Sequence, residues 1–340
     1  MNNDRIQEIL DLMEEARLDY FLISDPQSIA YCTGYYNDPH ERMFVFMISK
    51  HGNHTLFMND LFYLDHDLDV NIVWHKDGQD AIQTIVDEMH FPGRIGIDKN
   101  WASHFLLDLM KKLPDAKYIN ASPCVDLVRM KKDLQEQVLM IESSKINDAV
   151  MEEIIPFIQE GVTEKQLAKK LDELFFNHHS TCYGAIVAFG KNAADPHHEN
   201  DDTLLRKGDC VLIDMGCVYK GYCSDMTRTF FYEGILEEEI KVYEIVKKAN
   251  EAAEAMIKPG VKLSDIDKCA RKVISDEGYG KYFTHRLGHF IGRDVHEYGD
   301  VSSVNEMEVE EGMIFSIEPG IYLEGNFGVR VEDLVMVTKD

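Results

Sequence analysis

Four acidic residues that interrupt apolar, strand-like runs constrain this chain more than any other sequence feature. They fall in two segments, with Asp214 and Asp225 in residues 210–232 and Glu318 and Glu332 in residues 310–337. A carboxylate inside an apolar strand loses hydration, which raises its pKa unless a cation compensates. A fold that buries these runs must therefore supply positive charge beside them.

The first segment, CVLIDMGCVYKGYCSDMTRTFFY, is typical of a β-hairpin with Lys220-Gly221 as its two-residue turn. In that register Asp225 lies opposite Gly216, and Asp214 is its diagonal neighbour on the same face. Two carboxylates then converge on one patch. The alternative is that both aspartates face solvent.

In the second segment, Glu318 ends one apolar strand and Glu332 lies inside the next. The structural alternative for each glutamate is an ion pair with a neighbour such as Arg330. Between the two acidic segments, HRLGHFIGRDVHE places three of the chain's fourteen histidines within twelve residues, namely His285, His289 and His296. Histidines that are scattered through a core would rarely be so dense.

Together, these residues predict an oxygen-rich metal site with one imidazole, formed by Asp214, Asp225, His289, Glu318 and Glu332. Four carboxylates carry a charge that two divalent ions would neutralise, and this ligand set suits Mn, Co, Zn or Fe better than a structural zinc site. Two adjacent ions activate water and polarise a carbonyl, so the predicted reaction is amide hydrolysis.

Composition limits the other classes of function. The chain has 340 residues, enough for roughly two domains, and 61 acidic against 35 basic residues give a net charge of -26. This charge disfavours nucleic acid and anionic membranes as partners. The N-terminal segment lacks the apolar core of a signal peptide, and the seven cysteines are scattered without CxxC spacing, so we expect a cytoplasmic protein with buried thiols.

The pattern along the chain indicates an α/β (α+β) protein of two domains. Residues 1–122 alternate strand-like and helical stretches, as in a small mixed α/β domain, and residues 131–158 form a long amphipathic stretch that begins the second domain. Residues 161–176 and 260–278 each start with Gly-Val and a Thr or Ser cap candidate, followed by a helical pattern. This likeness hints at a duplicated α/β half.

Six fragments of residues 183–340 resemble the pita-bread metallopeptidase family, and within it the proline-specific branch of Xaa-Pro dipeptidases (prolidases) and Xaa-Pro aminopeptidases. They follow the family's order and approximate spacing: AFGKNAADPHH, LIDMG, SDMTRTF, HRLGHFIGRDVHE, SIEPGIY and GVRVED. DYFLISDPQSIAYCTGY is similar to the family's amino-terminal domain. The resemblance implies a creatinase/prolidase-like domain at residues 1–122 and a catalytic pita-bread domain at residues 123–340.

Carried over to this chain, the resemblance implies two divalent metal ions, with manganese expected and cobalt or zinc as alternatives. Asp214 would bind one ion, and His289 and Glu318 would bind the other. Asp225 and Glu332 would bridge the two ions, and Glu318 is also the implied general base.

The resemblance further implies substrate-binding and catalytic roles for three histidines. His197 lines the substrate site, while His285 and His296 hydrogen-bond substrate and help to move a proton to the departing proline nitrogen. Arg330 would orient the neighbouring ligands. The implied substrates are small peptides with proline after the first residue, whose scissile amide is tertiary and has no N–H.

Two residues depart from the family pattern, which usually reads GHGIG where this chain has GHFIG. Phe290 would narrow the pocket or alter the loop geometry, and Arg293 would either pair with an acid such as Asp294 or Asp38 or meet an acidic substrate side chain. The polar loop Gly34–Met43 is either a solvated connection or a lid over a catalytic site.

These features predict a dinuclear metal-dependent Xaa-Pro dipeptidase. The alternatives are an Xaa-Pro aminopeptidase that acts on longer peptides and a pita-bread protein that binds peptides without hydrolysis. Relatives are commonly dimers, so a homodimer is expected, with no nucleic acid or membrane partner.

Overall fold

In a computed structural model that describes residues 1–90 and 92–339, the chain forms two compact units, Met1–Arg129 and Met130–Asp340. The first unit continues past the boundary expected after residue 122. Helix α5 (Pro123–Met130) explains the extension, because Cys124, Val125 and Val128 pack into the core of the first unit.

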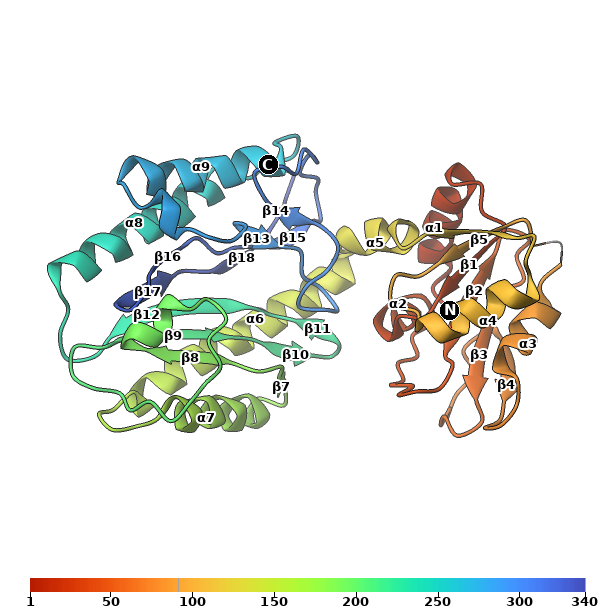
Figure 1. The fold of residues 1–340 in the computed structure, drawn as a ribbon, viewed down its shortest axis with the longest axis horizontal. Coiled ribbons are helices and arrows are strands. Elements are labelled where there is room, and N and C mark those ends of the chain that lie inside the picture. The colour runs from red at the N-terminus through yellow and green to blue at the C-terminus, as the bar shows by residue number, and fades with distance from the viewer. Residues whose placement is uncertain (91, 340) are drawn as a thin grey trace. The chain divides into compact units, whose positions relative to one another are not determined.

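The first unit is a six-stranded sheet with helices against it (Figure 1), in the strand order β4-β3-β2-β1-β5-β6. Its strands are β1 (Tyr20–Ile23), β2 (Val45–Ser49), β3 (Thr55–Asn59), β4 (Asn71–His75), β5 (Arg94–Ile97) and β6 (Lys117–Asn120). Its other helices are α1 (Asn3–Glu15), α2 (Pro26–Thr33), α3 (Ala81–Glu88) and α4 (Ser103–Lys112).

Both faces of the sheet's centre are buried, as the short apolar runs predict. Alternate residues of β1 enter different cores because side chains alternate across a strand. Phe21 and Ile23 belong to the core that contains side chains of α1, while Tyr20 and Leu22 belong to the core that contains side chains of α3 and α4. Strand β6 lacks such a run, and its residues are only half-buried or exposed.

The second unit contains four long helices and short strands. The helices are α6 (Leu134–Ile154), α7 (Glu164–Asn177), α8 (Glu237–Glu254) and α9 (Leu263–Asp276). The strands are β7 (Thr181–Cys182), β8 (Ile186–Phe189), β9 (Cys210–Met215), β10 (Cys217–Tyr219), β11 (Tyr222–Cys223), β12 (Met226–Phe231), β13 (Gly288–His289), β14 (Asp300–Val301), β15 (Ile314–Ile317), β16 (Gly320–Leu323), β17 (Phe327–Arg330) and β18 (Asp333–Met336).

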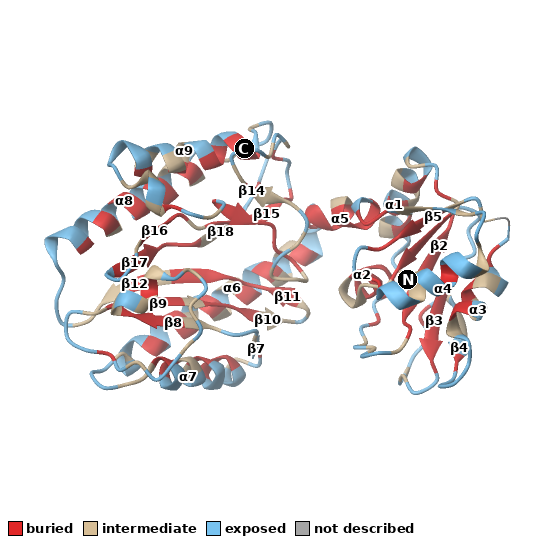
Figure 2. Ribbon diagram, in the orientation of Figure 1, coloured by how far each residue is buried: buried red, intermediate tan, exposed pale blue. Residues whose placement is uncertain are grey.

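Strands fill the middle of this unit, between two pairs of helices (Figure 1). Helices α6 and α7 contact the strands β7, β8, β10 and β11, and α8 contacts β15, β16 and β17. Figure 2 shows that the strands are mostly buried, whereas α7, α8 and α9 each have an exposed side. The two strand groups meet where Glu332 donates its backbone N–H to Thr227 O at 3.1 Å.

The hairpin prediction is confirmed. Lys220 and Gly221 both have positive φ, +49° and +82°, and form the turn between Tyr219 and its partner Tyr222. The same register continues between β9 and β12, where Asp214 pairs with Thr227. Asp225 therefore lies opposite Gly216, with Asp214 further along the neighbouring strand.

The two helices expected to share a cap signal begin differently. Thr163 caps α7 and forms a reciprocal capping box with Gln166. Helix α9 starts after Lys262 without a side-chain cap, and the hydroxyl of Ser264 instead donates to Glu306. The prediction of a Ser cap is therefore wrong for the second helix, because a carboxylate nearby binds the hydroxyl.

Each helix in residues 1–90 and 92–339 is too short or too polar to cross a membrane.

We predict that Gly216→Ala destabilises the second unit, because a Cβ at this position would lie 1.9 Å from Tyr183 Oη and 2.1 Å from the carbonyl oxygen of Ser224. Overpacking of this kind typically lowers the free energy of unfolding by ~1–3 kcal/mol. The matched control is Gly234→Ala, whose nearest neighbouring atom lies at 3.7 Å. Chemical denaturation of both variants measures the effect, and equal stability of the two would contradict the packing argument.

Candidate metal centre

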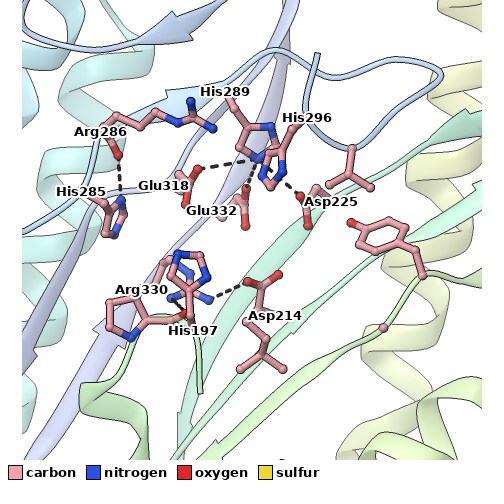
Figure 3. A pocket seen from close by; sticks show the side chains of 15 residues that line it. His197, Asp214, Asp225, His285, Arg286, His289, His296, Glu318, Arg330 and Glu332 are labelled. Carbon is pink, nitrogen blue, oxygen red and sulfur yellow. Dashed lines mark hydrogen bonds and ion pairs between the residues drawn. The ribbon is translucent and has the colours of Figure 1, made fainter. Parts of the chain in front are cut away.

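Five side chains from separate elements of the second unit meet in one cavity (Figure 3). They come from β9 (Asp214), the link between β11 and β12 (Asp225), β13 (His289), the residue after β15 (Glu318) and the link between β17 and β18 (Glu332). The cavity has a volume of about 430 Å³. The structure therefore gathers the five residues that the sequence selected as metal ligands.

His289 lies at the centre of three of these carboxylates. Its Nε2 atom is 3.5 Å from Asp225 Oδ2, 3.6 Å from Glu318 Oε1 and 3.8 Å from Glu332 Oε1. Burial lowers the pKa of His289, but the carboxylates of Asp225 and Glu318 outweigh it, and the net effect raises that pKa. The ring is held in place because its Nδ1 contacts the backbone oxygen of Phe290 at 3.2 Å.

Arg330 is the buried cation of the site, and it pairs with Asp214 rather than with a glutamate. Its Nη2 donates to Asp214 Oδ2 at 2.6 Å, and its Nε donates to Thr227 Oγ1 at 3.0 Å. The ion pair expected as the alternative role of Glu318 or Glu332 is therefore made by a residue on another strand. One carboxylate is compensated in this way, and the other three share the single imidazole of His289 and still need further positive charge.

Glu332 shows that need most directly. Its Oε2 accepts a hydrogen bond from Thr227 Oγ1 at 2.8 Å, whereas its buried Oε1 has no hydrogen-bond partner among the described residues. Burial, together with the negative charges of Asp225 and Glu318, holds the pKa of Glu332 well above its usual range. A buried carboxylate oxygen without a donor fits a site whose partner is a cation.

The pKa values of two other carboxylates in the cavity are raised as well. Burial raises the pKa of Asp214 to about 6, despite the opposing charge of Arg330. Burial also raises the pKa of Glu318 to about 7, against the opposing effect of His289. Oxygen donors with one imidazole are the ligands that divalent ions such as Mn²⁺, Co²⁺ and Zn²⁺ accept, so the residues present fit a metal centre.

The three predicted substrate histidines all line this cavity, but their surroundings differ. His285 makes internal contacts with both ring nitrogens, since Nδ1 is 2.7 Å from Arg286 O and Nε2 is 2.8 Å from Tyr322 Oη. For His296, no hydrogen bond from the described part of the chain reaches either ring nitrogen. Burial lowers the pKa of each of these two imidazoles to about 4, so both are neutral at pH 7.

His197 is exposed on a loop that hydrogen bonds to the carboxylate of Glu164 hold in place. The buried Glu164 carboxylate accepts four hydrogen bonds: at Oε1 from Phe189 N (2.8 Å) and Asn192 Nδ2 (2.9 Å), and at Oε2 from His198 Nε2 (2.7 Å) and Asp201 N (3.0 Å). These bonds use the roughly four lone-pair sites of a carboxylate. Glu164, His198 and Asp201 also have metal-ligand spacing, but their bonds make them a clamp for residues 189–201.

A second clamp holds the loop that carries His296. Lys132, which is buried, donates from Nζ to Glu297 Oε2 at 3.0 Å, and Glu297 Oε1 accepts from Arg293 N at 2.9 Å. Because Glu297 directly follows His296, the buried ion pair fixes the backbone from which that imidazole projects.

Phe290 and Arg293 both lie outside the cavity lining. The ring of Phe290 is fully buried against Phe315, with centroids 5.3 Å apart, so it fills the core. The guanidinium of Arg293 lies over the ring of Tyr222 at 5.3 Å, beside the hairpin turn.

The loop Gly34–Met43 belongs to the first unit. It is tied locally, since Asp38 accepts from His40 N at 3.0 Å and Arg42 forms two hydrogen bonds with Asp77. A role as a lid stays a prediction from the sequence.

Several residues of the site and its supports were not selected from the sequence. They include Glu164, Thr227, Arg286, Tyr322 and the pair of Lys132 and Glu297. Thr227 and Tyr322 lie inside the fragments SDMTRTF and SIEPGIY, and Arg286 lies between two selected histidines. Their closeness in sequence to predicted site residues could therefore have indicated that they belong to the site. Glu164 had no such signal, because its partners lie more than twenty residues away.

Comparison with known proteins decides the family. The family model "Metallopeptidase family M24" matches residues 138–339, and the model "Creatinase/Prolidase N-terminal domain" matches residues 5–131. The chain belongs to metallopeptidase family M24. As a member of this family it is a metallopeptidase, and the resemblance seen in the sequence is confirmed.

Relatives in family M24 resemble this chain over nearly its whole length. An uncharacterized peptidase from Staphylococcus aureus (strain bovine RF122 / ET3-1) is 34% identical over 345 residues, which cover 99% of this chain and 97% of the relative. The structure of a dipeptidase from Pyrococcus horikoshii OT3 matches with a TM-score of 0.90 and 36% identity, covering 98% and 94% of the two chains. A prolidase from Thermococcus sibiricus matches with a TM-score of 0.92 and 32% identity, covering 99% and 95%.

We predict that metal ions stabilise the protein more strongly as pH rises from about 5 to about 8. Without metal, the pKa values of Asp214 (about 6) and Glu318 (about 7) lie above their usual values of 3.8 and 4.5, so the folded state holds extra protons and loses stability as pH rises from about 4 to about 7. Metal binding requires these protons to leave. At a pH below the pKa of a ligand, each such ligand therefore lowers the metal affinity about tenfold per pH unit.

The difference in Tm with and without Mn²⁺, measured at each pH, tests this prediction. Glu332→Gln should reduce the difference at every pH because it removes one ligand charge. A metal-induced rise in Tm that is the same at pH 5 and pH 8 would contradict the assignment of raised carboxylate pKa values to the metal ligands.

We also predict that Glu164→Ala lowers the free energy of unfolding by ~3 kcal/mol, because it leaves several buried donors without an acceptor. Turnover should fall as well, since the loop that carries His197 loses its anchor. The control is Glu173→Ala on the same helix, whose exposed pair with Lys170 contributes at most ~0.5 kcal/mol. Denaturation and peptidase assays on both variants separate the clamp from an ordinary surface charge.

Proposed function

We propose that this protein is an Xaa-Pro dipeptidase that uses two divalent metal ions. Membership in family M24 and the similarity to a dipeptidase and a prolidase support the substrate class. The observation that carries the proposal is the meeting of four carboxylates with His289, with one buried oxygen of Glu332 left without a donor.

In this proposal the two ions would be held by Asp214, Asp225, His289, Glu318 and Glu332. Asp214 pairs with Arg330, whereas the other three carboxylates share the single imidazole of His289, so together they leave negative charge for metal ions to balance. Divalent ions supply Lewis acidity, which polarises the scissile carbonyl and makes water more acidic. Manganese is the proposed metal, with cobalt or zinc as alternatives.

Glu318 serves as the general base. Its carboxylate lines the cavity beside His289, where it can accept a proton from a water molecule in the cavity. The hydroxyl of Ser316 donates to Glu318 Oε1 at 3.2 Å and fixes the direction of the carboxylate.

The departing proline nitrogen must gain a proton, because the tertiary amide brings none. His296 is placed to pass this proton, since it lines the cavity and its ring nitrogens form no hydrogen bond within the described chain. His285 acts differently in this scheme, because Tyr322 and the Arg286 backbone occupy its nitrogens and make it a positioning residue. His197 closes the opposite side of the cavity.

The size of the cavity favours small substrates. Its volume of about 430 Å³ lies toward the lower end of the ~300–1,000 Å³ that is usual for small-molecule sites. An Xaa-Pro aminopeptidase is the alternative, and it would need room for residues after the proline. A cytoplasmic location and a homodimer remain predictions from the sequence.

We predict that enzyme loaded with Mn²⁺, Co²⁺ or Zn²⁺ releases leucine from Leu-Pro at least ~10-fold faster than from Leu-Pro-Gly. Glu318→Gln should lower kcat on Leu-Pro by ~100-fold or more, because it removes the base. Chromatography of released leucine, with metal content measured in parallel, gives both results. Comparable rates on the two peptides would select the aminopeptidase, and bound metal without hydrolysis of either would select a binding protein.

A further inference from the structure

Arg286 is a cation in the cavity that neither the metal centre nor its supports use. It lies between His285 and His289, lines the cavity and is exposed there. Figure 3 shows its guanidinium extending toward the side of the cavity where His289 and His296 lie. Within residues 1–90 and 92–339, no side chain forms an ion pair or hydrogen bond with this guanidinium.

The other two arginines near the site are already engaged. Arg330 is buried, and its Nε, Nη1 and Nη2 atoms donate to Thr227, Tyr322 and Asp214, respectively. Arg293 lies over Tyr222, away from the cavity lining. Arg286 is therefore the arginine of this cavity whose donors remain available in the described chain.

The charges of the site explain why such a donor would be needed. A dipeptide carries a carboxylate at its C-terminus, and a chain with a net charge of -26 that also places four carboxylates in this cavity repels an anion. Two divalent ions would balance those four carboxylates, and Arg330 is paired with Asp214. Arg286 then supplies a positive charge for an incoming carboxylate, and its planar fork matches the two oxygens.

We propose that Arg286 binds the C-terminal carboxylate of the dipeptide substrate, so that it selects dipeptides over longer peptides. This inference rests on the proposed Xaa-Pro dipeptidase activity and adds a residue that sets substrate length. In a longer peptide the group after proline is a neutral amide, which offers Arg286 one carbonyl oxygen and no charge. Arg286 acts in binding, so its loss affects KM more than kcat.

The test compares Leu-Pro with Leu-Pro-amide, which differ in the charge that Arg286 is proposed to bind. Arg286→Ala should lower kcat/KM on Leu-Pro by ~10- to 100-fold, mainly through KM, and should lower it on the amide far less. Arg286→Lys should recover part of the loss, because it keeps the charge without the fork. An equal loss on both substrates would overturn the proposal.

Product binding gives a readout that does not depend on turnover. Calorimetric titration of the metal-loaded protein with L-proline should show binding that Arg286→Ala weakens by ~10-fold or more, and L-prolinamide should bind weakly to both proteins. Arg206→Ala, which removes an exposed charge elsewhere on the same unit, is the control and should match the wild type. Unchanged proline affinity in Arg286→Ala would overturn the proposal.

The two hypotheses fail in different ways. If metal-loaded wild type cleaves neither Leu-Pro nor its amide, the dipeptidase proposal fails, and the proline titration still decides whether Arg286 binds a carboxylate. If wild type cleaves both substrates equally well, the dipeptidase chemistry stands and the role of Arg286 is refuted. A Tm measurement on each variant excludes misfolding as the cause of a loss.

Discussion

The crowding of like charges around His289 is the constraint on which the second unit depends. Three carboxylate oxygens lie within 3.8 Å of one imidazole nitrogen, and the surrounding strands exclude much of the water that would otherwise screen them. Such a cluster is costly without cations, because the charged form of each buried acid loses its hydration. The strands around it must therefore be rigid enough to hold the acids where protonation or metal can relieve the repulsion.

Arg330 connects several strands of the site through hydrogen bonds and so contributes to this rigidity. Its guanidinium links Asp214 on β9, Thr227 on β12 and Tyr322 on β16, and Tyr322 in turn contacts His285. Because a guanidinium presents its donors in one plane, the three partners are held in a fixed arrangement. One buried side chain thus couples the carboxylate of Asp214 to a histidine of the cavity wall.

Much of the fold and of the site could be predicted from local sequence patterns. The hairpin turn at Lys220-Gly221 and the four acidic residues of the cavity followed from short apolar runs that polar residues interrupt, and His289 followed from a segment dense in histidine. Strand β6 was not expected, because its partly exposed residues lack that signal.

The pairing of the residues that support the site could not be predicted from the sequence, because the partners lie far apart along the chain. Arg330 and Asp214 are 116 residues apart, and Lys132 and Glu297 are 165 residues apart. Whether a histidine keeps its nitrogens for substrate also depends on such partners, as the contact between His285 and Tyr322 shows.

The buried pair of Lys132 and Glu297 makes the entry of the chain into the second unit part of the catalytic architecture. Lys132 is the third residue of that unit, and Glu297 adjoins His296. The first residues of the second unit therefore help to fix the backbone beside the imidazole of His296, which lines the cavity. A substitution at Lys132, far from the cavity in sequence, would loosen that backbone from within the same unit.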